Sequence, residues 1–475
     1  MGAARDVWRN MLILGGGYVA RTVLRLGAIY FISNYFSKAD YGVYGFVFGY
    51  LFFFQTLADL GITTYLTREI SRDPSRVDEL VGTGLALRVM LAAASIALAA
   101  GGLFAIGRPP TVQLVSLIGS LSFLTLICGT FDAVFRARMR NEYATVADVV
   151  ASAGFLAGCV FLVAHRGTLA DLAWVVVISS LPPGLLKAYF ARHYVRPRLS
   201  IGGQLWRSML AVSPLLFLSK MLHVLYYRAD VFMLGLMRGD EAVAEYYVAF
   251  QLVDPFSAMP TIFVMTIFPL MARYYVQGEG KLEDSYRTAM RYMALLAFPL
   301  AVGATLASRK AILFIFPDTY AASSPILSLL IWAQALVFLR MVLDNVIVAA
   351  DRIALGAAIN GATLVLNIAL NFALIPRIGP MGAASATLAS SLFATGVRYY
   401  YVRRDICGVG WVRLLCRAAL PSAAVAAVVV TTAKAHILLT VAAAALALGV
   451  VGYWLYFTPR DRSIIRRAVL GKEEA

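Results

Sequence analysis

The sequence predicts an all-α integral membrane protein with about 14 transmembrane helices. Apolar residues make up 60% of the 475 residues and charged residues only 14%, well below the charged share of soluble domains. The apolar residues gather in runs of roughly 20, which is the length of a helix that crosses a bilayer core. Because these runs are continuous rather than alternating, they favour helices over the strands of a membrane barrel.

The expected spans follow these runs, with short polar breaks between them. They are 10–36, 41–67, 80–106, 111–135, 143–164, 170–191, 208–236, 242–272, 286–308, 322–349, 354–375, 381–401, 412–433 and 436–457. We expect two six-helix bundles in a pseudo-two-fold arrangement, formed by 1–194 and 208–405, with 195–207 as a cytoplasmic linker. Residues 406–475 then hold two additional helices and a cytoplasmic tail.

A weak internal repeat supports two related halves. The second span opens with DYGVYGF at 40–46, and the eighth opens in a similar way with AEYYVAF at 244–250. Arg21 near the middle of the first span has a counterpart in Lys220 of the seventh. Since six spans per half is an even number, both halves share one orientation in the membrane.

The basic residues predict the orientation of the chain. On this map of spans, 28 of the 42 Lys and Arg residues fall on one side and 8 on the other. By the positive-inside rule, both termini are cytoplasmic. We expect the protein in the cytoplasmic (inner) membrane. The net charge of +16 is spread over short loops with no basic domain, so we expect no nucleic-acid partner.

Several apolar runs carry charged residues near their middles, where a charge facing lipid is costly. They include Arg21, Arg25, Asp59, Arg88, Lys220, Asp254, Arg340 and Asp344. One interpretation is internal ion pairing, for which Arg340 and Asp344, four residues apart, are a candidate pair. The other is a polar cavity that binds a ligand. Ligand binding is favoured for Arg21, Arg25 and Lys220, because the first span holds no acidic residue and that of the seventh, Asp230, lies ten residues from Lys220.

Excess positive charge inside the membrane suits an anionic ligand, and guanidinium groups match phosphate or diphosphate oxygens in a bidentate way. The predicted substrate-binding residues are Arg21, Arg25, Arg88, Lys220 and Arg340. Asp59 and Asp254 are the candidates for coupling transport to H⁺ or Na⁺. We expect no other cofactor and no metal site, because the four His and four Cys residues show no ligand spacing.

Enzymatic signatures are missing from the sequence. It contains no GxxxxGK[ST] phosphate-binding loop and no HExxH zinc motif, and the loops between spans are short. We therefore predict that the protein is not an enzyme.

The order of several short motifs resembles the polysaccharide-biosynthesis flippases of the O-antigen type. These motifs are FSKADYGVYGF at 36–46, DLGI at 59–62, TRE at 67–69, RADVFMLG at 228–235, FPL at 268–270 and GPMGAASAT at 379–387. That family belongs to the multidrug/oligosaccharidyl-lipid/polysaccharide exporter superfamily. The resemblance implies two six-helix bundles that form a V around a central cavity. It also implies that a polyprenyl-diphosphate-linked oligosaccharide is flipped from the cytoplasmic to the outer leaflet by alternating access.

Two other functions stay open at the level of sequence. A cation-coupled multidrug exporter of the same fold would favour a carboxylate-rich, aromatic cavity, and a membrane scaffold would use the charges for structural pairs alone. For a flippase, the expected partners are the polyprenyl-diphosphate-linked glycan and membrane lipids. A polysaccharide polymerase or glycosyltransferases are further candidate partners.

Overall fold

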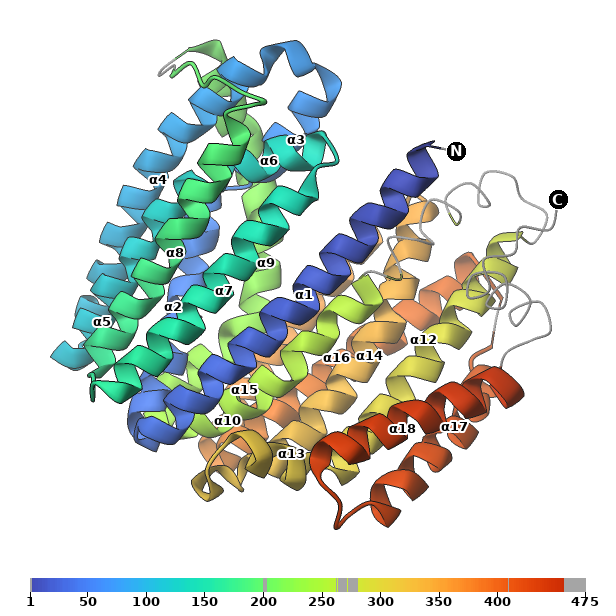
Figure 1. Cartoon of the computed structure of the whole chain (residues 1–475). Coiled ribbons are helices and arrows are strands. Elements are labelled where there is room, and N and C mark those ends of the chain that lie inside the picture. The colour runs from blue at the N-terminus through green and yellow to red at the C-terminus, as the bar shows by residue number, and fades with distance from the viewer. Residues whose placement is uncertain are drawn as a thin grey trace. The chain divides into compact units, whose positions relative to one another are not determined.

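The computed structural model describes residues 2–199, 203–261, 263, 271, 281–408 and 410–456. Over these residues the chain is helical and contains no strand (Figure 1), which confirms the predicted fold class. Nine of the described helical segments are long and apolar enough to cross a membrane. The count of 14 spans stays a prediction, because parts of the eighth and fourteenth spans lie outside the described residues.

The chain folds into two compact units, Met1–Ala244 and Glu245–Ala475. The boundary falls after α9 (Gln204–Met237), because this helix packs against α2 (Lys38–Asp59) of the first unit. The ring of Phe232 on α9 stacks on that of Phe46 on α2 with 5.9 Å between centroids. The expected linker at 195–207 therefore lies inside the first unit, and its residues 200–202 are outside the described residues.

The first unit is a helical bundle in which α1 packs on α7, α7 on α8, and α2 on α4 and α9. Its other elements are α1 (Gly2–Tyr35), α3 (Ile62–Arg72), η1 (Pro74–Arg76), α4 (Val77–Ala105), α5 (Pro110–Ser120), η2 (Leu121–Ile127), α6 (Thr130–Ala137), α7 (Asn141–Ala164) and α8 (Leu169–Ala191). Figure 1 shows α1 lying along α7.

Two of the expected spans are broken helices. The second span divides into α2 and α3 at Leu60 and Gly61, whose φ angles are 42° and 78°. A left-handed backbone ends an α-helix, and glycine adopts it without steric cost. The fourth span divides into α5, the 3₁₀ segment η2 and α6. Both breaks fall next to charged residues of the site described below.

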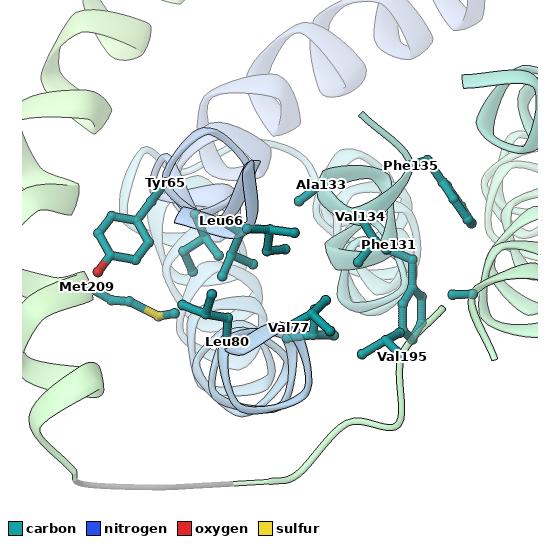
Figure 2. Packing of buried hydrophobic residues seen from close by; sticks show 14 of the residues in the cluster. Tyr65, Leu66, Val77, Leu80, Phe131, Ala133, Val134, Phe135, Val195 and Met209 are labelled. Atoms are coloured by element: carbon teal, nitrogen blue, oxygen red, sulfur yellow. The ribbon is translucent and has the colours of Figure 1, made fainter. Parts of the chain in front are cut away.

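A core of buried apolar side chains holds the two breaks in place. Figure 2 shows Leu66 of α3, Leu80 of α4 and Val134 of α6 within this cluster. Ile62 follows the first break directly and is fully buried, as is Val134 one turn after the second. Since tightly packed interiors leave little freedom to the backbone, this core fixes the positions of Asp59 and Thr130 at the breaks.

Close backbone contact requires a glycine at position 82 of α4. A Cβ atom there would collide with the backbone carbonyl of Arg198. The segment before α9 lies against α4 at this point, because Arg198 N donates to the Asp78 carbonyl oxygen at 3.0 Å. Only a residue without a side chain permits that approach.

The second unit is also a bundle, in which α14 packs against α12 and α16, α15 against α16, and α17 against α12. Its elements are α10 (Asp240–Val253, which begins in the first unit), η3 (Asp254–Ser257), α12 (Lys281–Leu306), α13 (Ser308–Ile315), η4 (Asp318–Tyr320), α14 (Ser323–Ala349), α15 (Ile353–Ile378), α16 (Pro380–Asp405), α17 (Val412–Thr431), α18 (Ile437–Val451) and the π-helical turn η5 (Gly452–Tyr456). Lys310 of α13 donates to the Thr432 carbonyl oxygen at 3.2 Å, which ties the last two helices to this unit.

Candidate functional site

Arg88 is one of the two most deeply buried charged residues described in the first unit, with 3% of its side chain exposed. From α4 it donates to the Leu126 carbonyl oxygen at 2.7 Å and to Thr63 Oγ1 at 2.5 Å, and it forms an ion pair with Asp59. Leu126 belongs to η2 and Thr63 to the first turn of α3. One guanidinium group therefore joins the two broken spans.

Asp59 ends α2 and lies between two cations. Besides Arg88, it accepts from Lys220 Nζ of α9 at 2.5 Å. Thr63 Oγ1 donates to the same carboxylate at 2.6 Å, and the helix break between Asp59 and Thr63 makes this local contact possible. A carboxylate shared by two cations leaves one positive charge without a counter-charge in this group.

A second cluster surrounds Lys187 of α8, whose side chain is 13% exposed. Its Nζ lies 3.0 Å from Asp132 Oδ2 of α6 and 3.1 Å from Asp148 Oδ1 of α7. The other oxygen of Asp148 accepts from Arg21 Nη1 of α1 at 2.8 Å. Four helices are thus tied by charge-assisted hydrogen bonds, which are the stronger kind.

The two clusters form one line of alternating charge, which we name the charge chain. Its members in order are Arg21, Asp148, Lys187, Asp132, Arg88, Asp59 and Lys220. No ion pair between Asp132 and Arg88 is found among the described contacts, but Arg88 donates to Thr130 Oγ1 at 3.3 Å, two residues before Asp132 on α6, which brings the two clusters together. Four cations and three aspartates leave an excess of one positive charge. The side chains of Arg21 and Lys220 at the two ends are 38% and 39% exposed and that of Asp148 is 36% exposed, whereas the four members from Lys187 to Asp59 are 3–20% exposed.

The structure brings together four of the residues that the sequence singled out, namely Arg21, Asp59, Arg88 and Lys220. For Arg21 and Lys220 the sequence favoured ligand binding over ion pairing. Both have an aspartate partner, which comes from another helix and is therefore invisible within one span. The functional roles of all four residues stay predictions.

Three other predicted residues, Arg25, Arg340 and Asp254, are not members of the charge chain as defined. Each has interactions of its own, and the last two belong to the second unit. Their predicted roles in substrate binding and ion coupling remain predictions.

The second unit holds a comparable buried cation, Arg398 of α16, which is 0% exposed. Its Nε donates to Asp344 Oδ1 of α14 at 2.5 Å, and its Nη2 donates to Asn360 Oδ1 of α15 at 2.5 Å. The structure thus pairs Asp344 with Arg398, whereas the sequence suggested Arg340 as its partner.

Sequence reasoning missed Lys187 and Arg398 as site residues, because both count among the 28 basic residues assigned to the cytoplasmic side. Each lies within a helix rather than in a loop, Lys187 four residues before the end of α8. A usable signal was present in the sequence, since both residues fall inside the expected spans 170–191 and 381–401, and in the structure each helix continues for four or more residues beyond the cation.

Metal binding has no support in the described part of the chain, where no group of three His, Cys, Asp or Glu side chains could hold an ion. The four cysteines are free thiols.

Comparison with known proteins identifies the family. A family model described as "Polysaccharide biosynthesis protein" matches residues 7–275. The chain belongs to this family. A second model, MatE, matches residues 216–373. The predicted resemblance to polysaccharide-biosynthesis flippases is thereby confirmed.

Individual relatives agree with this assignment. The chain is 23% identical over 291 residues to the teichuronic acid biosynthesis protein TuaB of Bacillus subtilis (strain 168), and the match spans 58% of this chain and 58% of TuaB. The fold is similar to that of the lipid II flippase MurJ in an inward closed conformation, with a TM-score of 0.75, 13% identity and coverage of 97% of this chain and 99% of MurJ. An inward-facing multidrug resistance MATE family transporter of the MOP superfamily follows, with a TM-score of 0.65, 14% identity and coverage of 81% and 94%.

These likenesses place the family member among multi-pass membrane proteins with a flippase-like transporter fold. The two solved structures belong to a flippase and a transporter, not to enzymes. At these identities the structural matches establish the fold, while the substrate is a separate question.

Proposed function

We propose that this protein flips a polyprenyl-diphosphate-linked oligosaccharide from the cytoplasmic to the outer leaflet by alternating access. The excess positive charge of the charge chain, with half-exposed cations at both ends, carries the proposal. A diphosphate needs compensating charge to leave water, and cations held inside a membrane protein provide it. Membership of the polysaccharide biosynthesis family and the fold likeness to a lipid II flippase support a glycan-bearing lipid as the cargo.

Partner exchange at Asp59 explains how a headgroup would bind. Lys220 and Arg88 share this carboxylate. When Lys220 leaves Asp59 and pairs with a phosphate oxygen, Arg88 still neutralises the Asp59 carboxylate. The exchange therefore leaves no unpaired carboxylate in the membrane. Arg21 would bind in the same way at the other end of the chain, while its partner Asp148 stays paired with Lys187. Arg25 and Arg340 complete the proposed set of substrate-binding cations.

Transport would be coupled to the movement of an ion through membrane-embedded aspartates. Asp59 and Asp254 are the proposed sites for H⁺ or Na⁺. A proton on Asp59 would neutralise the carboxylate that pairs with Lys220 and Arg88. An anionic headgroup would then supply the negative charge that these two cations need. Binding of the proton and of the headgroup would therefore favour each other, as thermodynamic linkage requires.

The test is transport by purified protein in lipid vesicles that contain a fluorescent polyprenyl-diphosphate-linked sugar. The triple variant R21Q/R25Q/K220Q removes three membrane-embedded charges, and we expect it to lose flipping while wild-type amounts reach the membrane. The matched control R68Q/R72Q/R76Q removes three charges from a solvent-exposed segment and should flip normally. Full flipping by the first variant rejects the proposed site.

A cation-coupled multidrug exporter is the second candidate function. The MatE match over 216–373 and the fold likeness to a MATE transporter favour it. The same vesicles loaded with a fluorescent organic cation separate the candidates, since dye efflux without sugar flipping supports the exporter. Neither activity would support a membrane scaffold.

We further propose that the protein lies in the cytoplasmic membrane with both termini in the cytoplasm. A reporter that fluoresces only in the cytoplasm, fused to the C-terminus, tests this orientation, and a dark fusion of full length contradicts it. A polysaccharide polymerase or glycosyltransferases would act before or after the flipping step, and co-purification with them is the corresponding test.

A further inference from the structure

Two polar triads, each centred on a cation that is at most 13% exposed, occupy corresponding positions on successive spans of the two units. In the first unit, Lys187 of α8 contacts Asp132 of α6 and Asp148 of α7. In the second unit, Arg398 of α16 contacts Asp344 of α14 and Asn360 of α15. In each triad a cation from the expected sixth or twelfth span binds residues of the two preceding spans.

The sequence spacing within the triads agrees to within one residue. The cation follows the aspartate by 55 residues in the first triad and by 54 in the second. Asp148 follows Asp132 by the same interval as Asn360 follows Asp344. Three matched positions on three successive spans, with the same contacts, are what duplication of one six-helix unit would leave behind.

The triads differ in chemistry at their middle position. Asp148 is a carboxylate, whereas Asn360 is a neutral amide. The charges within the second triad therefore cancel, because it holds one cation and one aspartate. The first holds one cation and two aspartates, and its remaining negative charge is compensated by Arg21, which binds Asp148 Oδ2 at 2.8 Å.

Burial shows which partner of Asp148 faces outward. Lys187 is 13% exposed and holds one carboxylate oxygen, while Arg21 is 38% exposed and binds the other. Among the described residues, this ion pair is the only salt bridge of Arg21. The guanidinium is thus held at one nitrogen by Asp148, which Lys187 binds from the more buried side, and its remaining N–H groups can meet a ligand from the exposed side.

We infer that Asp148 is a positioning residue of the first unit, which holds Arg21 in place to bind the diphosphate of the transported lipid. The equivalent Asn360 only joins helices of its own unit. This inference rests on the proposed function, and it assigns the two halves different tasks at one duplicated position. Fixing the orientation of a guanidinium in advance improves binding, because less side-chain freedom is lost when the ligand arrives.

The chain supplies its own matched variants for a test. D148N gives the first triad the chemistry of the second, and N360D does the reverse. Flipping of the fluorescent polyprenyl-diphosphate-linked sugar is measured over a range of lipid concentrations, together with thermal unfolding in detergent. We expect D148N to raise the half-saturating lipid concentration about tenfold, as loss of one oriented charge-assisted hydrogen bond would. D148E should restore the wild-type value, and N360D should leave it unchanged.

Thermal unfolding separates positioning from folding. Because the second triad is held with an amide at this position, D148N should unfold within a few degrees of the wild type. An unchanged half-saturating concentration in D148N, or an equal rise in N360D, overturns the inference.

A second measurement distinguishes failure of this inference from failure of the proposed function. Protection of the wild type and of D148N against unfolding by farnesyl diphosphate reports binding without transport. If the wild type binds this probe more tightly than D148N but flips no sugar, the flippase function fails and the positioning role stands. If the wild type flips sugar and both proteins bind alike, only the positioning role fails. If the wild type neither flips nor binds, both are rejected.

Discussion

Replacing Arg88 by methionine should strongly destabilise the first unit. Arg88 is 3% exposed and donates to three oxygen atoms besides Asp59, those of Leu126, Thr63 and Thr130. R88M keeps most of the side-chain volume but leaves those acceptors without their donor. Removing one partner of a buried ion pair costs about 3–5 kcal/mol, and we expect R88M to lower the free energy of unfolding by that amount.

The assay is reversible unfolding of the purified protein in detergent micelles. R21M is the matched control, because Arg21 is 38% exposed and forms one ion pair, so its loss should cost about 1 kcal/mol or less. The double variant D59N/R88M should lose less than the sum of the single variants, since each removes the other's partner. If R88M unfolds like the wild type, or if the two losses simply add, the account of Arg88 as the link between the broken spans is wrong.

Three further predictions concern positions that hold helices together. K187M should lower the free energy of unfolding by about 3–5 kcal/mol, because it removes a cation that is 13% exposed and is shared by Asp132 and Asp148. A loss below 1 kcal/mol in the same unfolding assay would contradict this. In α4, G82A should lower the free energy of unfolding by about 1–3 kcal/mol, because its Cβ collides with a backbone carbonyl. The control G101A has nothing within 4 Å of its added Cβ and should leave the free energy of unfolding unchanged or raise it by up to about 1 kcal/mol. T168A removes the capping box of α8 and should cost about 0.5–2 kcal/mol, while T431A, whose hydroxyl binds only carbonyls of its own helix, should have little effect.

The sequence predicted the fold class well, because apolar runs of membrane-spanning length are a strong signal. It did not predict that the second span breaks after Asp59, since Leu60 with a positive φ has no signature in composition. It also singled out Arg21, Asp59, Arg88 and Lys220 from their depth in apolar runs. The ion-pair partners of these residues could not be predicted from the sequence. In two cases the partners are more than 100 residues apart in the chain, and the periodicity of one helix carries no information about another helix.

Lys187 shows a different limit of reasoning from sequence. A cation near the end of an apolar run reads as a loop residue under the positive-inside rule. In the structure, the helix continues to Ala191, and the two aspartates of neighbouring helices keep the lysine inside. The spacing that Asp132, Asp148 and Lys187 share with the second triad was present in the sequence, but only the contacts reveal which residues to compare.

The charge chain also has a consequence for biogenesis. During synthesis, Arg21 enters the membrane long before Asp148 emerges from the ribosome, and Asp59 precedes Lys220 by 161 residues. The charged side chains of the early spans therefore stay unpaired until the later helices are synthesised. During this time water or an insertion factor must shield these charges from lipid. A pause or truncation before α9 would leave an assembly intermediate open to quality-control proteases.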